Sequence, residues 1–350
     1  MEKPENISLN VDGTAVILLD QTMLPGEPVY LELNRPEELF DAIKSLRVRG
    51  APAIGIFAAY AIYVLALRAD KTDIRTFAAK VISDSNMLGA ARPTAVNLTK
   101  QLQRMTSMVN NCDYRTVPQI LEAMRKEAEA IQWEDILMCR TISEYGLSLI
   151  GDNSGIMTYC NAGPLATSLY GTALGPILLA NERGTNLRVF CCETRPLLQG
   201  ARLTAYELNQ AGIDCTLICD NMASIVMKEG KIDAVFVGCD RLARNGDVAN
   251  KIGTSGAAIL AKHYGIPFYV FCPSSTYDRD CLRGGEIVIE QRDPGEITEL
   301  NFRSPIAPAG VKCYNPAFDV TDNTLITAII TEKGIHRAPF EESLRVLTDR

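Results

Sequence analysis

Two reactive side chains stand where an apolar, strand-like run of this chain breaks into a polar loop. Cys160 follows the run 155–159, and Asp240 follows the run 235–239. Ligands of parallel α/β sheets bind at the carboxyl ends of the strands, so a thiol and a carboxylate in these positions are candidates for chemistry. The chain holds only two histidines, so the most common proton carrier is scarce. Cys160 and Asp240 are therefore the first candidates for a catalytic pair.

The thiol has a competing interpretation as a packing residue. The chain contains eleven cysteines, and buried thiols often behave as small apolar side chains. Cys160 differs from most of them because Asn161 and Gly163 indicate a turn at this point. Cys239 is the rival thiol, although alternation along a strand directs it to the face opposite Asp240.

The two histidines predict no Ser-His-Asp or Cys-His centre. His263 falls among apolar residues of a predicted helix, so we expect it to be structural. His336 follows Gly334 in a tail, and we expect it to be exposed. Acid–base chemistry is then left to other groups.

Length, charge and cysteine usage bound the class of protein. At 350 residues the chain is longer than one typical domain, so two domains are expected. Its net charge of −7 and lack of a basic stripe argue against nucleic-acid binding. The polar, acidic start predicts no secretion signal, so we expect free thiols in a reducing cytoplasm. No CxxC pair is present, and no metal site is expected.

One apolar run, Ala51 to Ala66, resembles a membrane span. It is shorter than the roughly 20 residues that cross a bilayer, and it carries Pro52 and Gly55. The run predicts a buried core helix of a soluble, cytoplasmic protein.

Residues 1–125 predict a smaller, mainly helical N-terminal domain, and residues 126–150 a helical connector. The charged, helix-favouring stretch that supplies the connector begins at Val117 and predicts one or two helices. The expected strands of the first domain are 15–20 and 29–33, and its expected helices are 36–46, 52–68, 72–83 and 93–108.

From 151 to 350 the pattern changes to short apolar strands that alternate with amphipathic helices. This alternation predicts an α/β, Rossmann-like C-terminal domain with a parallel sheet covered on both faces. The expected strands are 155–159, 187–192, 215–219, 234–237 and 267–271, and the expected helices are 200–210, 222–228, 255–264 and 324–331.

Two loops of the N-terminal domain suit an anion. In each, an arginine precedes a predicted helix that begins with a proline: Arg49 comes before Pro52, and Arg92 comes before Pro93. The free N–H groups of a helix start and a nearby guanidinium together favour a phosphate. A plain helix start with an exposed arginine is the alternative for each loop.

Two loops of the C-terminal domain concentrate polar groups beside strand ends. The loop 193–200 carries Gln199, which we expect to contact a ligand more readily than Arg195 does. An interface with the other domain is the alternative there. A later loop carries Asn250 and Lys251 near a helix start, where an amide and a point charge suit a hydroxyl-rich or phosphorylated ligand. A solvated surface lysine is the alternative.

Taken together, these motifs resemble the methylthioribose-1-phosphate isomerase family. The matching stretches run in order along nearly the whole chain and are RGAPAIG (49–55), RPTAVNL (92–98), CNAGPLAT (160–167), ETRPLLQGARLTA (193–205), DNMAS (220–224), GCDRLARNGDVANKIGTSG (238–256), YNPAFDVT (314–321) and ITEKG (330–334).

The resemblance implies a homodimer that converts 5-methylthioribose 1-phosphate to 5-methylthioribulose 1-phosphate in methionine salvage, without metal or nucleotide cofactor. It implies a smaller helical N-terminal domain and a Rossmann-like C-terminal domain. Carried over motif by motif, it implies Cys160 and Asp240 as the catalytic pair. The substrate contacts that it implies are Arg49, Gly50, Ala51, Arg92, Gln199, Asn250 and Lys251.

The phosphate on C1 requires the sugar ring to open before hydrogen moves between C2 and C1. We expect Asp240 to protonate the ring oxygen as a general acid, which requires a partly apolar pocket that keeps its proton in place. We expect Cys160 to handle the proton at the hydroxyl or carbon being oxidised. The hydrogen can move as a proton through an enediol or as a hydride, and the residues leave both routes open.

Three alternatives share this resemblance. A 5-deoxyribose 1-phosphate lacks only the thiomethyl group, and an apolar pocket discriminates weakly between such ligands. A ribose 1,5-bisphosphate would need a further basic cluster. The regulatory subunits of a eukaryotic translation-initiation exchange factor are related scaffolds, but the retained Cys160 and Asp240 favour catalysis.

Overall fold

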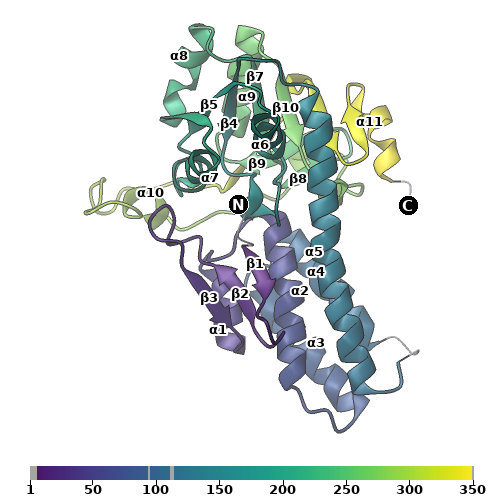
Figure 1. Cartoon of the computed structure of the whole chain (residues 1–350). Helices are drawn as coiled ribbons and strands as arrows, with labels where there is room; N and C mark the ends of the chain where they lie inside the picture. Colours follow the sequence, from purple (N-terminus) through teal and green to yellow (C-terminus); the bar gives the residue numbers. More distant parts are fainter. Residues whose placement is uncertain (1–5, 94, 111–113, 349–350) are drawn as a thin grey trace. The chain divides into compact units, whose positions relative to one another are not determined.

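The computed structural model describes residues 6–93, 95–110 and 114–348 (Figure 1). Its contacts divide the chain into two compact units. The N-terminal unit runs to Leu137 and includes Pro164–Leu169, and the C-terminal unit comprises Met138–Gly163 and the residues from Tyr170 onward. The segment 164–169 thus belongs to the N-terminal unit, although it follows Cys160 closely in sequence.

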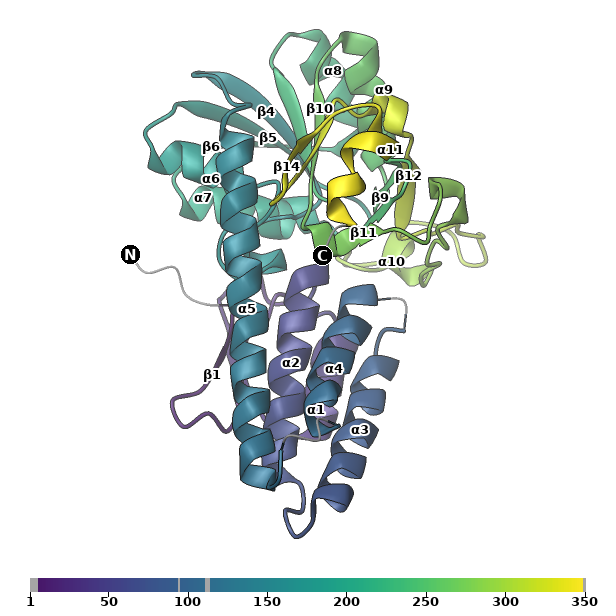
Figure 2. The same cartoon turned by 90° about the vertical axis from the view of Figure 1, so that its right-hand side faces the viewer.

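The N-terminal unit combines a small antiparallel sheet with a bundle of helices (Figure 2). The sheet has the order β1-β2-β3, with β1 at Ile7–Leu9, β2 at Val16–Leu19 and β3 at Tyr30–Leu33. The helices are α1 (Pro36–Lys44), α2 (Ala51–Arg68), α3 (Ile74–Ala90), α4 (Val96–Val109) and the first part of α5 (Val117–Leu147). The predicted mainly helical character of this region is confirmed.

Helix α2 is the core helix of this unit. Every residue from Ala53 to Ala66 is buried. Within the described residues, α2 is the one helix long and apolar enough to cross a membrane, and 78% of it lies buried inside the protein. A helix that is apolar on all sides and covered by its neighbours is a core helix. The prediction made for the run 51–66 is confirmed.

Helices α3 and α4 differ from their predicted bounds. α3 continues beyond the predicted end at residue 83 to Ala90, and Asp84 is buried inside it and paired with Lys80 at 2.5 Å. α4 begins at Val96, so Pro93 precedes that helix instead of opening it. Thr94 lies outside the described residues.

Seven strands form the main sheet of the C-terminal unit in the order β14-β13-β10-β7-β4-β5-β6. All neighbouring pairs are parallel except β13 and β14. The strands are β4 (Ser154–Tyr159), β5 (Leu187–Cys192), β6 (Asp214–Ile218), β7 (Ala234–Val237), β10 (Phe268–Phe271), β13 (Ala328–Thr331) and β14 (Gly334–His336). The predicted Rossmann-like α/β class is confirmed.

Helices cover both faces of this sheet. On one face, alternate residues such as Val235 and Val237 pack with α8 (Ala223–Lys228) and α9 (Thr254–Tyr264). On the other face, Phe236 packs in a cluster with residues of α6 (Gly175–Glu182), α7 (Ala205–Gln210) and α5. A five-residue π-helical turn, Gly200–Thr204, leads into α7.

The strand order reverses direction beside β4. The chain runs from β4 to β5 and β6 at one edge, and then returns to place β7 on the other side of β4. The junction between β4 and β7 is therefore the topological switch point, outside which ligands of open α/β sheets bind.

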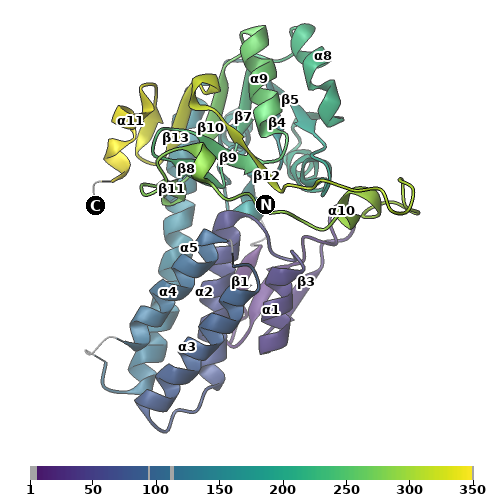
Figure 3. The same cartoon turned by 180° about the vertical axis from the view of Figure 1, so that it is seen from behind.

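A second, smaller sheet is formed by strands that alternate along the chain with the last strands of the main sheet (Figure 3). Its order is β11-β8-β9-β12, with β8 at Arg241–Ala243, β9 at Val248–Lys251, β11 at Tyr277–Asp278 and β12 at Phe318–Thr321. No strand was predicted in these segments, because runs of two to four residues carry too little periodicity. Two short helices, α10 (Gly295–Thr298) and α11 (Phe340–Ser343), complete the unit.

The tail 324–331 was predicted as a helix, and that prediction is wrong. Ala328–Thr331 is strand β13, which is fully buried between β10 and β14. A short apolar run does not reveal its period, and burial within the sheet decides the outcome. His336 was expected to be exposed, but it is buried in β14. His263 was expected among apolar neighbours, but it lies on the exposed side of α9.

Candidate active site

Cys160 and Asp240 follow neighbouring strands of the main sheet. Tyr159, the last residue of β4, is the Cα partner of Val237, the last residue of β7. The next residues are Cys160 and Gly238, so the two loops leave the sheet at the same level. A Cβ atom on Gly238 would lie 2.8 Å from a side-chain carbon of the loop after Cys160. The two loops therefore meet at the switch point.

The backbone of Cys160 is fixed from two sides. Its φ of 63° lies in the left-handed region that residues other than glycine rarely adopt. Its N–H donates to Thr194 Oγ1 at 2.9 Å, and its carbonyl accepts from Thr204 Oγ1 at 2.6 Å. Such conformations persist only where the surroundings hold them, and they gather at functional sites.

The residues after the thiol are held by α7. Asn161 Nδ2 donates to Thr204 Oγ1 at 3.1 Å and to Glu207 Oε2 at 2.5 Å, and all three side chains are buried. A Cβ atom on Gly163 would lie 2.3 Å from Glu207 Oε2. The turn of Asn161 and Gly163 is thus specified by packing against α7.

Gln199 lies in the loop after β5, directly before the π-helical turn. It is 5% exposed, and its Oε1 atom has no hydrogen-bond partner among the described residues. Buried polar atoms are normally paired, so this oxygen suits a donor supplied by a ligand. Gly200 allows the loop to fold back, because a Cβ there would lie 1.7 Å from the carbonyl oxygen of Cys192.

Arg195 of the same loop has a structural partner. Its guanidinium donates to the carbonyl of Ile297 at 2.7 Å and lies 5.1 Å from the ring centroid of Phe302. These contacts join the loop to the segment around α10. The Arg195 guanidinium is thus engaged by contacts within the C-terminal unit.

Asp240 stands where the chain passes from the main sheet to the small sheet. Its N–H donates to the carbonyl of Ala249 at 3.0 Å, and Ala249 precedes Asn250 and Lys251 in β9. The antiparallel pairing of β8 and β9 thus brings Asp240 to these two polar residues. The Asp240 side chain is exposed to solvent.

Asn250 and Lys251 are buried, at 5% and 7% exposure. Asn250 Nδ2 donates to Thr254 Oγ1 at 3.1 Å. Lys251 Nζ lies 4.5 Å from the ring centroid of Phe318 in β12, a cation–π contact. The alternative of a solvated surface lysine is therefore wrong.

The start of α9 is occupied by a side chain of the same unit. Asp319 accepts from the N–H groups of Gly253 and Ser255 at 2.7 and 3.1 Å. Burial raises the pKa of the Asp319 carboxyl. These N–H groups are thus already paired.

Cys239 is a packing residue of the main sheet. It continues the alternation of Val235 and Val237 and packs against the same apolar cluster. Burial raises the pKa of the Cys239 thiol well above its ordinary value, with Cys272 as a close neighbour. A thiol held protonated in this way is a poor nucleophile or base.

In the N-terminal unit, Arg49, Gly50 and Ala51 lie at the start of α2. Gly50 caps the helix with a φ of 97°, and a Cβ atom there would lie 2.5 Å from the Cα and carbonyl oxygen of Ala166. Only glycine fits this approach. The loop therefore packs directly on the segment 164–169, which follows the Cys160 loop in sequence.

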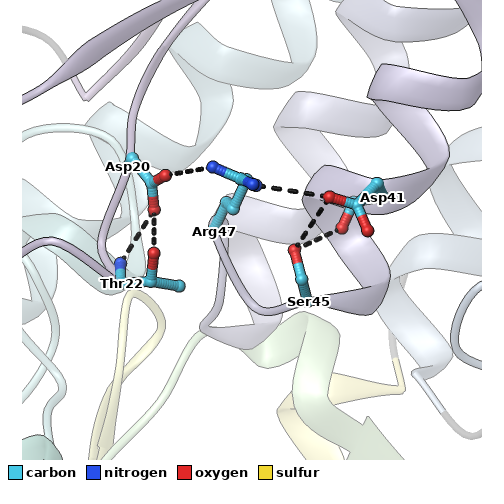
Figure 4. A network of polar contacts seen from close by, with 5 residues as sticks. All are labelled: Asp20, Thr22, Asp41, Ser45 and Arg47. Carbon is cyan, nitrogen blue, oxygen red and sulfur yellow. Dashed lines mark hydrogen bonds and ion pairs between the residues drawn. The ribbon is translucent and has the colours of Figure 1, made fainter.

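An ion-pair network fixes the chain just before Arg49 (Figure 4). Arg47 contacts Asp20 Oδ2 at 2.5 Å and Asp41 Oδ2 at 3.3 Å. Asp20 is buried and also accepts from the N–H and hydroxyl of Thr22 at 2.9 and 2.6 Å. Arg47 is thus engaged in structure, and it anchors the loop from which Arg49 extends.

Arg92 lies in the segment that leads to α4. A Cβ atom on Gly55 of α2 would lie 3.2 Å from the carbonyl oxygen of Asn97 and 2.9 Å from Gln101 Cγ, so α2 and α4 begin side by side. The N-terminal unit thereby brings its two arginine-bearing loops to the same end of the bundle.

Among the described residues, no group of three or more His, Cys, Asp or Glu side chains is arranged to hold a metal ion.

Residues 47–338 match the model of the initiation factor 2 subunit family. The chain belongs to this family. The methylthioribose-1-phosphate isomerase of Symbiobacterium thermophilum is 59% identical over 99% of this chain and 96% of its own length. The 5-deoxyribose 1-phosphate isomerase of Petrotoga mobilis is 54% identical over 97% of this chain and 98% of its own. Because relatives at this level of identity are sugar 1-phosphate isomerases, this protein is an aldose–ketose isomerase.

Two solved structures of the family have the same fold. The 5-methylthioribose 1-phosphate isomerase of Pyrococcus horikoshii superposes with a TM-score of 0.93 and is 37% identical, covering 99% of this chain and 96% of that chain. The translation initiation factor eIF-2B subunit delta from A. fulgidus superposes with a TM-score of 0.90 and is 41% identical, covering 99% of this chain and 100% of that chain.

The side chains that hold Cys160 and Asn161 in place were not predicted from the sequence. Thr204 and Glu207 fall inside a predicted helix, and Thr194 and Asp220 lie in loops after two different strands. Only the three-dimensional sheet order brings them to Cys160. The one signal in the sequence was the concentration of polar residues after each strand.

Proposed function

We propose that this isomerase converts 5-methylthioribose 1-phosphate to 5-methylthioribulose 1-phosphate, a step of methionine salvage. The observation that carries the proposal is the position of Cys160 and Asp240 at the ends of neighbouring strands beside the switch point. Similarity to two isomerases named for this substrate supports it. We further propose a cytoplasmic homodimer that uses no metal and no cofactor.

In the proposed reaction, Asp240 opens the sugar ring. It donates a proton to the ring oxygen while the bond from that oxygen to C1 breaks, and the ring oxygen becomes the hydroxyl on C4. Asp240 is exposed in the unliganded protein, so the bound sugar has to exclude water from this carboxyl. The pairing of its N–H with Ala249 keeps the residue beside Asn250 and Lys251.

Cys160 completes the transfer of hydrogen from C2 to C1. In the hydride route, the hydrogen of C2 moves with its electron pair to C1, and Cys160 accepts the proton of the C2 hydroxyl as the ketone forms. In the proton route, Cys160 takes the hydrogen of C2 as a proton and returns it to C1 of the resulting enediol, and the proton of the C2 hydroxyl passes to the Asp240 carboxylate as the ketone forms. Turnover in heavy water separates the two, because hydride transfer leaves C1 of the product without deuterium.

The remaining predicted residues would bind the sugar phosphate. Arg49 and Arg92, with the N–H groups at the start of α2, suit the phosphate because two arginine loops lie at one end of the bundle. Gln199 Oε1 suits a sugar hydroxyl because it is buried and lacks a partner among the described residues. Asn250 and Lys251 suit the hydroxyls nearest Asp240.

A second candidate substrate is 5-deoxyribose 1-phosphate. The Petrotoga mobilis relative named for it is 54% identical, close to the 59% of the Symbiobacterium thermophilum relative. The two sugars differ by one thiomethyl group, which an apolar pocket distinguishes by about 1–3 kcal/mol.

Side-by-side kinetics of the purified protein test the proposal. We expect kcat/KM for 5-methylthioribose 1-phosphate to exceed that for 5-deoxyribose 1-phosphate by about ten-fold or more, in line with the loss of one small apolar group. The reverse order would assign the second substrate. Turnover of neither sugar would favour a regulatory binding protein, to which the similarity with the A. fulgidus initiation-factor subunit points.

A further inference from the structure

Three consecutive strands of the sheet, β4, β5 and β6, end in loops that are joined by hydrogen bonds. Thr194, in the loop after β5, is the middle member. Its hydroxyl donates to the carbonyl of Cys192 at 3.0 Å, and the same oxygen accepts the N–H of Cys160 at 2.9 Å. Thr194 is completely buried, so no water competes for these bonds.

Asp220, which follows β6, holds Thr194 in turn. Its Oδ1 accepts the N–H of Thr194 and its Oδ2 accepts the N–H of Arg195, both at 2.7 Å. Hydrogen bonds from two successive N–H groups to a carboxylate are short and strong. Thr194 has a φ of 66°, which is unfavourable for a β-branched residue. The carboxylate therefore stabilises a backbone conformation that Thr194 would not adopt alone.

We propose that Asp220 and Thr194 are positioning residues for the Cys160 thiol. This inference rests on the proposed function, in which Cys160 moves a proton of the substrate. Asp220 acts through Thr194, and Thr194 acts through the backbone of Cys160; neither side chain needs to touch the sugar. Cys160 has a left-handed backbone conformation, and its N–H is bonded to the buried hydroxyl of Thr194. These two constraints fix the direction of its Cα–Cβ bond and therefore the position of the thiol.

Two substitutions at one buried position test the hydroxyl. Thr194→Val keeps the volume and removes both hydrogen bonds, whereas Thr194→Ser keeps the hydroxyl. We expect kcat to fall about ten-fold or more in Thr194→Val with KM changed less than about three-fold, because a misplaced catalytic group costs turnover. We expect Thr194→Ser to stay within about three-fold of wild type. A loss of activity in Thr194→Ser equal to that in Thr194→Val would overturn the proposal.

Alkylation of Cys160 by iodoacetamide reports on the thiol without any substrate. The extent of modification is read at each cysteine by peptide mass spectrometry. We expect Cys160 to react several-fold faster in Thr194→Val than in wild type, because its half-buried loop loosens. Cys313 is partly exposed and lies outside these three loops, so it should react at the wild-type rate, which makes it the internal control. An unchanged rate at Cys160 would contradict the positioning role.

Asp220→Asn provides a second variant should Thr194→Val fail to fold. The two N–H groups use different oxygens of Asp220, and in asparagine one of these becomes an NH2 group, which cannot accept a hydrogen bond. We expect the same two effects as in Thr194→Val, and we expect the double variant to be little worse than Thr194→Val alone, because both changes break one chain of contacts. Fully additive losses would overturn the proposal. If wild type turns over neither sugar, the proposed function fails, while the alkylation rates still decide the positioning role.

Discussion

Cys160 and Asp240 stand at the carboxyl ends of β4 and β7, two strands that pair side by side although β5 and β6 lie between them in the chain. This relationship exists only because the chain reverses its direction of travel at β4. A thiol and a carboxyl group thereby follow adjacent strand ends without being near each other in sequence. Catalysis by this pair requires this juxtaposition.

Gln199 should affect binding more than stability. Replacing it with methionine removes an amide whose oxygen is buried without a partner among the described residues. We expect KM to rise about ten-fold, the loss of roughly one hydrogen bond to a ligand, while the free energy of unfolding is unchanged or slightly higher. Steady-state kinetics and urea unfolding check both parts. A normal KM would remove Gln199 from the site.

Gly253 should not tolerate alanine, although a neighbouring glycine of the same helix start should. Gly253 has a φ of 101°, and a Cβ atom there would lie 1.9 Å from the hydroxyl of Tyr159, whereas Gly256 has open space. We expect Gly253→Ala to cost at least about 2 kcal/mol of the free energy of unfolding, because strain and a clash add. We expect Gly256→Ala to stabilise by about 0.5 kcal/mol. Urea unfolding of both variants makes the comparison, and equal effects would refute it.

His336 should make the protein less stable in mild acid. Its Nδ1 contacts the carbonyl of Ser343 and its Nε2 contacts Thr331 Oγ1, both at 2.9 Å. Thr331 Oγ1 accepts the N–H of Lys333 and so can donate to Nε2, which favours the neutral ring with the proton on Nδ1. Burial lowers the pKa of His336 from its ordinary value of 6.5.

The direction of the change in stability with pH follows from how many protons the folded and unfolded states bind. Below about pH 6.5 the unfolded chain binds a proton that the folded protein resists, so stability is present above that pH and is lost as the pH falls toward the lowered pKa. We expect the melting temperature to drop between about pH 7.5 and about pH 5.5, and to drop less in His336→Gln. His263→Gln, on an exposed helix face, is the matched control and should keep the wild-type slope. Equal slopes in all three proteins would contradict the role of His336.

The sequence predicted the parts of this fold that local patterns determine. The apolar run of α2 and the strands that precede Cys160 and Asp240 were recognised because their burial is continuous. β13 was taken for a helix because a run of four buried residues has no readable period. The hairpin of β8 and β9, which brings Asn250 beside Asp240, was missed for the same reason.

The contacts that hold Cys160 could not be predicted from the sequence. Asp220 reaches Thr194 only because β6 lies next to β5, and Thr194 reaches Cys160 only because β5 lies next to β4. Strand order is a global property that no local pattern encodes. Similarly, Asp319 pairs with the N–H groups at the start of α9 across a separation of more than sixty residues.

Turnover of 5-methylthioribose 1-phosphate by Cys160→Ser and Asp240→Asn tests the catalytic pair most directly. We predict that each variant loses about 10²-fold or more in kcat with an unchanged melting temperature, since each removes one acid–base group. Two exposed residues serve as controls: Asp214, the first residue of β6, and Cys219, which follows that strand. Asp214→Asn and Cys219→Ser should retain wild-type turnover. Near-normal turnover in Cys160→Ser or in Asp240→Asn would contradict the account.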